Sequence, residues 1–594
     1  MSKATYSKSP DSKTLFFFLF FAIFLPFFNL DAKKTINSCN NKEAPKLTIV
    51  LIVDQLAHHH IKKLKPYLRY GIKDLFSHGV VYSNAYHPHG VPETTPGHHA
   101  FSTGALPKDH GAVTNQWLDA ECHKIAYDLD TSKEAAVLSN LECPENGKSC
   151  HNTMVDGLSD QFIWRSIETI PNKVFSISLK SYPAIAMANR LGKAIWFDEK
   201  KGIFTSSKKY FEQVPDWIDQ FNKGVVLQEL KKRRWQLAYP ENHKAYDFPY
   251  IKNYDYAGLP FSLINKTLVT EEPKDAPLLS KSLLKSLSKP PHKYRAKYEH
   301  KTCSSYELFL KSPFSSEAVL MLAQQCIEKN FDKKHGNSML LWLSLSNFDL
   351  AGHIYGPDCL EVVDMLYHID KQIKNFMNFL NQFVGENKYV LVFSADHGIA
   401  PIPEIQKLKG YSRARRIVDV DLIKDVNAHL FATFGINDFV LCFEPSAFTI
   451  DQKIFTALNE HDQKAIMHNL ITFLKKYPGI KNAWTCEELK QTSFKTDDLE
   501  NFYKNQIYEG RFGGVICQPE PYCLISGYTK GTSHATPYDY DTHVPLIVYR
   551  KEHLPAHIIT QRVWIPQVCV TLAKMLTIPK PSISTFDHLP GLWK

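Results

Sequence analysis

Residues 389–398 read YVLVFSADHG, an apolar run that ends in the adjacent pair Asp396 and His397. Continuous rather than alternating hydrophobicity indicates a strand that is buried on both faces, as in a parallel sheet covered by helices. Two polar groups that are desolvated directly after such a strand need partners. The stretch therefore predicts a buried parallel strand that delivers an Asp-His pair to a functional edge of the sheet.

Four other runs share this character. The five runs are Leu47–Val53, Val174–Ser178, Met339–Leu345, Tyr389–Phe393 and Val544–Tyr549. Apolar residues at helical spacing lie between them, for example in Leu360–Phe383. Strands that alternate with helices predict an α/β fold with a largely parallel sheet.

Composition and length suggest one large, decorated domain. Hydrophobic residues make up 44% of the 594 residues, enough for a large core. No internal repeat is visible, and we expect a single catalytic domain at residues 45–594 with insertions near 121–160, 200–334 and 401–510. The net charge of +9 mildly favours anionic substrates. No basic stripe or Arg-rich tract indicates a nucleic-acid-binding surface.

The N-terminus has the pattern of an export signal. Three lysines precede Leu15–Leu30, an apolar run that is shorter than a membrane-spanning helix and contains Pro26. We expect residues 1–32 to be a signal peptide and the protein to be periplasmic or secreted. Two alternatives stay open, an uncleaved anchor, which would be the protein's contact with a membrane, and a buried core helix.

The 12 cysteines include no CxxC pair, which disfavours a thiolate zinc site. In an exported chain the even number permits disulfides, for example between Cys143 and Cys150 or between Cys517 and Cys523. Their connectivity cannot be deduced from the sequence, and buried free thiols are the alternative.

Polar side chains follow three of the predicted strands. They are Asp54 after the first run, Asp349 and His353 in DLAGH after the third, and Asp396 with His397 after the fourth; His534 precedes the fifth run. The carboxyl ends of parallel strands meet at one edge of a sheet, so these groups should converge. Three carboxylates and three imidazoles suit two zinc-like ions. Taken singly, each residue could instead be a helix cap or a surface group.

A second cluster, at residues 92–117, reads PETTPGHHAFSTGALPKDHGAVTNQW. Thr94 lies at a turn before Pro96 and Gly97, at the start of a helix-compatible run. A hydroxyl at a helix N-terminus beside a metal is well placed to ionise and to attack phosphorus. Backbone N–H groups and Asn115 would hold the phosphoryl oxygens. The alternative is that Thr94 only caps the helix.

These motifs resemble those of the alkaline phosphatase superfamily. TTPGHHAFSTGALPKDHG, DLAGHIYGP, SADHG and HATPYDYDTHVPL occur in order within Leu47–Pro579. The threonine-nucleophile branch is the most similar, with the phosphate-irrepressible bacterial alkaline phosphatases and the type I phosphodiesterase/nucleotide pyrophosphatases. In that branch an Asn that contacts phosphate follows the nucleophile by 21 positions, the spacing from Thr94 to Asn115, which selects Thr94 over Thr95. The resemblance implies a three-layer α/β/α sandwich with cap insertions.

The resemblance also implies two zinc ions per chain. Asp349, His353 and His534 would bind one ion, and Asp54, Asp396, His397 and the Thr94 oxygen the other. Four further histidines are expected to buttress the ligands or to be structural; they are His98, His99, His110 and His543. The run His58–His60 is expected on the surface.

The run from Ser178, SLKSYPAIAMANRLGKAIWFDE, resembles an element that places a Lys and an Arg on the phosphoryl group in the monoesterase branch. Lys180 matches the Lys, and Tyr182 stands where the Arg would be. A dianionic monoester has one more charge than a diester, so Lys180 favours monoesters, whereas the loss of the Arg weakens this preference. We expect hydrolysis of small phosphate monoesters through a phospho-threonine intermediate. Phosphodiester or pyrophosphate hydrolysis is the first alternative, and a catalytically silent binding module the second.

Overall fold

All five predicted strands lie in one large sheet. They are β1 (Leu47–Val53), β5 (Lys173–Ser178), β8 (Met339–Leu345), β9 (Tyr389–Ser394) and β16 (His543–Tyr549). The computed structural model describes residues 44–118, 123–166, 170–269, 306–333 and 337–593. Every residue of β1, β8 and β9 is buried, which is the physical reason that these segments are apolar without alternation.

The strand order is β17-β2-β16-β9-β1-β8-β5-β6-β7, and β18 pairs with β2. The remaining strands are β2 (Val80–Tyr86), β6 (Lys193–Asp198), β7 (Ile203–Thr205), β17 (His557–Ile559) and β18 (Val563–Trp564). Strands β9, β1, β8, β5 and β6 are mutually parallel, which makes the sheet largely parallel as predicted.

Strand β16 is antiparallel to both of its neighbours, β9 and β2. Leu546 near its start pairs with Ser394 at the end of β9. The amino end of β16 therefore lies at the edge where the parallel strands have their carboxyl ends. This reversal brings the segment before β16, which contains His534, to the same edge as Asp54 and Asp396.

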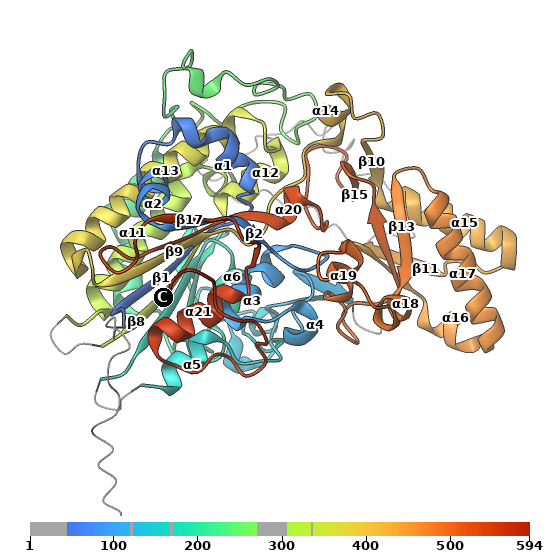
Figure 1. The fold of residues 1–594 in the computed structure, drawn as a ribbon, viewed down its shortest axis with the longest axis horizontal. Coiled ribbons are helices and arrows are strands. Elements are labelled where there is room, and N and C mark those ends of the chain that lie inside the picture. The colour runs from blue at the N-terminus through green and yellow to red at the C-terminus, as the bar shows by residue number, and fades with distance from the viewer. Residues whose placement is uncertain (1–43, 119–122, 167–169, 270–305, 334–336, 594) are drawn as a thin grey trace, which may run out of the picture. The chain divides into compact units, whose positions relative to one another are not determined.

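Helices cover both faces of the sheet (Figure 1). One face carries α2 (Gly71–His78), α11 (Pro313–Asn330) and α13 (Leu360–Leu380), and the other carries α3 (Thr94–Thr103), α5 (Leu158–Trp164), α6 (Ser181–Ala188) and α21 (Gln567–Leu576). The predicted three-layer α/β/α sandwich is confirmed. The predicted helix at 360–383 is α13, followed by a π-helical turn at Asn381–Gly385.

A smaller sheet lies beside the large one, in the orange part of Figure 1. Its antiparallel strands, in the order β11-β12-β14-β13, are β11 (Val440–Glu444), β12 (Ala447–Ile450), β14 (Val515–Pro519) and β13 (Ile480–Thr485). Together with α15 (Asp419–Phe434) and α17 (Glu460–Lys476) it forms a separate apolar cluster. Strand β14 lies beyond Gly510, so this sheet extends past the expected insertion at 401–510.

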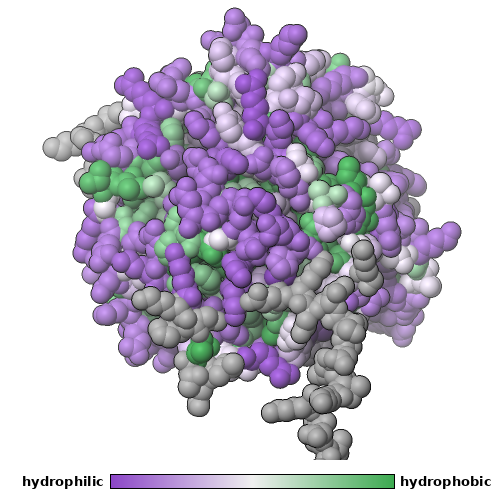
Figure 2. Space-filling model, turned by 60° about the vertical axis from the view of Figure 1, so that its left-hand side comes forward, coloured by the Kyte–Doolittle hydropathy of each residue, from purple (hydrophilic) through white to green (hydrophobic). Residues whose placement is uncertain are grey.

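The surface of the molecule and its membrane-spanning potential can be described for the residues that the structure covers. The face drawn in Figure 2 is mostly hydrophilic, with hydrophobic side chains in separate patches. Among the described residues, no helix has the length and hydropathy needed to cross a membrane. The predicted signal peptide at 1–32 lies outside the described residues.

Cys143, Cys150, Cys517 and Cys523 are free thiols, so neither of the two pairs that are close in sequence is bridged.

Candidate active site

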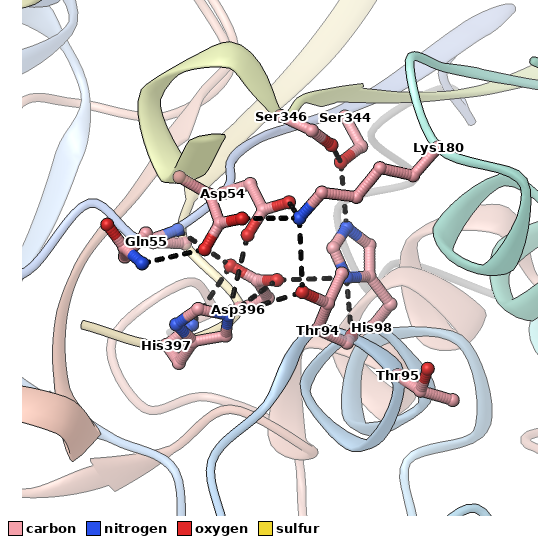
Figure 3. Close-up of polar contacts among 12 residues, drawn as sticks. Asp54, Gln55, Thr94, Thr95, His98, Lys180, Ser344, Ser346, Asp396 and His397 are labelled. Atoms are coloured by element: carbon pink, nitrogen blue, oxygen red, sulfur yellow. Dashed lines mark hydrogen bonds and ion pairs between the residues drawn. The ribbon is translucent and has the colours of Figure 1, made fainter. Parts of the chain in front are cut away.

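The predicted metal ligands come together at the carboxyl edge of the large sheet. Figure 3 shows Asp54, Thr94, Asp396 and His397 among them. Asp54 directly follows β1, and Asp396 and His397 follow β9. Asp349 and His353 lie on α12 (Asn347–Tyr355), which begins just after β8. All of the ligands are buried except His353, whose side chain is 26% exposed. The strand order thus brings side chains from motifs that are far apart in the sequence into one cluster.

Two sets of side chains offer ligand atoms that all lie within 4.8 Å of one another. One set is Asp54, Asp396 and His397, as predicted for one ion. The other is Asp349, His397 and His534, with His397 where the prediction has His353. His353 still contacts Asp349, because its Nε2 lies 3.2 Å from Asp349 Oδ1. The structure therefore brings all six groups together, and their division between two ions stays a prediction.

The three imidazoles are oriented in the same way. Nδ1 of each ring lies within hydrogen-bond distance of a backbone carbonyl oxygen: His353 with Thr532 (3.0 Å), His397 with Gly398 (2.8 Å) and His534 with Pro92 (2.9 Å). A carbonyl can only accept, so each Nδ1 carries the proton and donates it. Nε2 of each ring then faces a carboxylate, at 3.2 Å for His353, 3.4 Å for His397 and 3.8 Å for His534. Metal-binding histidines are typically oriented by such contacts.

The electrostatics of the cluster favour a bound cation. Burial and the charges of Asp349 and Asp396 raise the pKa of Asp54 well above its usual value. Burial opposes the ionisation of Asp349, but Lys180 and His353 outweigh it and hold the pKa of Asp349 well below the usual range. Asp54 Oδ1 and Asp396 Oδ2 are buried, and His397 Nε2 lies 3.4 Å from each of them. Buried carboxylate oxygens beside an imidazole Nε2 fit divalent metal ions of the zinc type.

Thr94 is the first residue of helix α3 and faces this cluster. Its Oγ1 lies 3.4 Å from His397 Nε2 and 3.5 Å from Lys180 Nζ. The N-cap position belongs to Glu93, so Thr94 is not the helix cap. A Cβ on Gly97 would lie 2.2 Å from the Asp396 carbonyl oxygen. Glycine at this position therefore lets the first turn of α3 pack directly on the backbone that carries the ligands.

Thr95 points away from Thr94, toward Asn115 (Figure 3). Its backbone N–H and its hydroxyl both donate to Asn115 Oδ1, each at 2.8 Å. The Asn115 N–H in turn donates to Glu93 Oε2 at 2.8 Å. Because the backbone N–H of Thr95 can only donate, the Asn115 side-chain atom that it contacts must be the amide oxygen. The Asn115 NH2 group is a donor, and its contact with a phosphoryl oxygen stays a prediction.

Lys180 and Tyr182 also lie at the cluster. Lys180 follows β5, and its Nζ donates to Asp349 Oδ2 at 2.6 Å and to Asp54 Oδ2 at 2.8 Å. Burial opposes its charge, but the two carboxylates outweigh it and raise the pKa of Lys180 well above its usual value. The Tyr182 ring centre lies 5.6 Å from Nζ. Their contacts with a substrate stay a prediction.

Comparison with known proteins places the chain in a family. The model of the type I phosphodiesterase / nucleotide pyrophosphatase family matches residues 48–558. The chain belongs to this family. This membership confirms the resemblance drawn from the motifs and the predicted enzyme class, a hydrolase of phosphoric esters.

Individual relatives agree with this assignment. "Alkaline phosphatase PhoV" of Synechococcus elongatus is 26% identical, over 93% of each chain. "Alkaline phosphatase PafA" of Elizabethkingia meningoseptica is 27% identical, over 87% of this chain and 88% of the relative. A crystal structure of wild-type alkaline phosphatase PafA has the same fold, with a TM-score of 0.77 at 23% identity, covering 92% of this chain and 98% of that one.

One contact residue, Gln55, was missed by the sequence reasoning. Its Nε2 donates to Asp349 Oδ1 at 2.7 Å, and its backbone N–H donates to Asp396 Oδ1 at 3.1 Å. It adopts a φ of 73°, an uncommon conformation for a residue other than glycine. Its position directly after Asp54, at the end of a buried strand, was the available signal.

The histidines outside the ligand set have varied roles. His98 buttresses the site as expected: its Nδ1 lies 2.7 Å from the Thr94 carbonyl oxygen and 3.2 Å from Asp396 Oδ2. The buried rings of His99 and His110 stack on each other.

The expectation that His58–His60 is a surface run is wrong, because His60 is 1% exposed and the His58 ring stacks on His543 at 3.9 Å. Helix α1 (His58–Leu64) packs against β16, which buries one side of the run.

Proposed function

We propose that this enzyme hydrolyses small phosphate monoesters through a phospho-threonine intermediate on Thr94, with two zinc ions per chain. The observation that carries the proposal is the convergence of three buried carboxylates and three oriented imidazoles on the Thr94 hydroxyl. The names of PhoV and PafA, both alkaline phosphatases, support the monoester class.

The ligand set fits zinc, which takes imidazole nitrogen and carboxylate oxygen. We assign Asp349, His353 and His534 to one ion, and Asp54, Asp396, His397 and Thr94 to the other. The position of His397 in both close sets supports two neighbouring ions. When bound, such ions lower the pKa of a coordinated hydroxyl and offset the charge that develops on a leaving oxygen.

The chain's own residues account for the rest of the reaction. The Thr94 hydroxyl gives up its proton to solvent and its Oγ1 attacks phosphorus. The bond between Oγ1 and phosphorus forms as the bond to the leaving oxygen breaks, and that oxygen takes a proton from solvent. The Asn115 NH2 group and the Thr94 N–H at the start of α3 would bind the phosphoryl oxygens. Water then attacks phosphorus from the side that the leaving group vacated, releasing inorganic phosphate and restoring the hydroxyl.

The preference for monoesters should depend on Lys180. A charge-assisted contact to a terminal phosphoryl oxygen is worth ~1.5–3 kcal/mol, so Lys180→Ala should lower kcat/KM for an aryl monoester about 10–100-fold more than for the matched diester. Tyr182→Arg should shift the preference further toward monoesters, because a guanidinium offers two parallel donors.

The measurement is kcat/KM for both ester classes in wild type and in both variants. Metal content serves as the control, because Lys180 also contacts Asp54 and Asp349. An equal loss for both classes at full metal content would assign Lys180 a general electrostatic role. It would also favour the alternative, phosphodiester or pyrophosphate hydrolysis, which the family description includes.

We also propose that the enzyme acts outside the cytoplasm, in the periplasm or after secretion. The basic start and the apolar run Leu15–Leu30 support this. N-terminal sequencing of the mature protein should find a start near Ala32. A cytosolic protein that still begins at Met1 would contradict export, and a membrane-bound protein with an intact N-terminus would indicate an uncleaved anchor.

A further inference from the structure

Two of the proposed ligands depend on one loop, Tyr528–His534, which we call the histidine loop. His534 lies at its end. The carbonyl oxygen of Thr532, within the loop, accepts the Nδ1 proton of His353 at 3.0 Å. The position of this backbone therefore sets the direction in which both imidazoles present Nε2.

The side chain of Arg416, on β10 (Arg415–Val418), holds the histidine loop in place. Its Nη2 donates to the Gly531 carbonyl at 2.7 Å, and its Nη1 donates to the Tyr528 carbonyl at 3.2 Å. Its Nε and Nη2 also donate to the two carboxylate oxygens of Glu404, each at 2.9 Å. The Arg416 side chain is 7% exposed, and its charge-assisted contacts with Glu404 and Gly531 are partly buried. A planar guanidinium can join two carbonyls and a carboxylate in this way, whereas an ammonium cannot reproduce the fork.

The far side of the loop packs tightly against α12. The Thr532 N–H donates to the His353 carbonyl at 2.9 Å, and the Thr532 hydroxyl donates to the Ala400 carbonyl at 2.7 Å. Gly531 has a φ of +73°, and a Cβ there would lie 2.3 Å from the His353 carbonyl oxygen. The loop is thus held between Arg416 on one side and the backbone of His353 on the other.

We infer that Arg416, itself held by Glu404, is a positioning residue that sets the affinity of the enzyme for the ion bound by Asp349, His353 and His534. In the part of the chain that the structure describes, the hydrogen bonds of Arg416 and Glu404 reach each other, Tyr528 and Gly531 but no candidate ligand and not Thr94, so the effect acts through the loop. The inference rests on the proposed function for the presence of that ion. Both residues belong to the expected insertion at 401–510, which gives this part of the chain a role in the metal site.

The test is a zinc titration of the full-length protein against a competing chelator. Loss of an outer contact to a metal ligand typically costs 10–100-fold in affinity. We expect Arg416→Met to lower the affinity for one of the two zinc ions about 10–100-fold and to leave the affinity for the other unchanged. Glu404→Gln should have a smaller effect in the same direction, and Arg416→Lys should not restore the affinity. Saturating zinc should return kcat of Arg416→Met close to the wild-type value.

Arg413→Met is the matched control, because the Arg413 side chain is 80% exposed and pairs with Glu520. It should keep wild-type zinc affinities. Thermal melting of the metal-free variants separates positioning from folding, since a merely structural role for Arg416 would lower the metal-free Tm and weaken both ions alike. That result, or wild-type zinc affinities in Arg416→Met, would overturn the inference about Arg416 and leave the proposed function standing. A wild-type protein that binds no zinc would overturn the proposed function as well.

Discussion

Replacing Thr94 by alanine should lower kcat for phosphate monoesters by several orders of magnitude, roughly 10³–10⁶-fold, as expected when a covalent nucleophile is removed. The reason is geometric. Thr94 Oγ1 is the hydroxyl that faces His397 and Lys180, and the described residues offer no other threonine or serine hydroxyl with both of these contacts. Steady-state kinetics with an aryl phosphate at saturating zinc gives the measurement.

Thr95→Val is the matched control for this prediction. It removes the hydroxyl bond to Asn115 Oδ1 but keeps the backbone N–H bond to the same atom. One neutral hydrogen bond is worth ~0.5–1.5 kcal/mol, so the loss should be about 2–10-fold. A larger loss from Thr95→Val than from Thr94→Ala would show that the neighbouring threonine carries the chemistry.

Removing the metal should abolish activity, and adding zinc should restore it. Without a metal ion, the single ammonium of Lys180 faces the three carboxyl groups of Asp54, Asp349 and Asp396 beside the nucleophile. The Thr94 hydroxyl is then a weak nucleophile at its ordinary pKa. Elemental analysis of the active enzyme should find two zinc ions per chain. His397→Ala should reduce binding of the ion that we assign to Asp54 and Asp396, and His353→Ala should reduce binding of the other ion, because each imidazole offers one Nε2 lone pair.

The exposed His461→Ala is the control for the histidine variants. It should retain both ions and full activity. An active preparation that contains no transition metal would contradict the proposed site, and a loss of both ions from His397→Ala would contradict the proposed division of the ligands, because His397 belongs to both close sets.

Continuous apolar runs were sufficient to locate β1, β8 and β9, because these strands are buried on both faces. The positions of Asp54, Asp349 and Asp396 followed from the parallel arrangement of these strands. His534 reaches the same edge for a reason that its motif does not contain: β16 runs antiparallel, so its amino end lies there. The motif identified the residue, and the topology explains its position.

Contacts between distant segments escaped prediction. The role of Gln55 depends on Asp349 and Asp396, which are far away in the chain, and the burial of His60 depends on how α1 packs. Arg416 shows no periodicity or spacing that would connect it to residues 528–531. Such contacts arise when segments that are distant in the sequence pack on one another. Periodicity, in contrast, reports only which face of a helix or strand is buried locally.

The stereochemical course at phosphorus tests the central claim, a covalent intermediate on Thr94, most directly. An isotopically chiral phosphate monoester would be turned over in the presence of an alcohol acceptor, and the configuration of the transferred phosphoryl group would be determined. Each in-line displacement inverts phosphorus. Attack by Thr94 followed by attack of the acceptor therefore predicts net retention. Net inversion would show that the acceptor attacks the substrate directly, and it would contradict the role that we assign to Thr94.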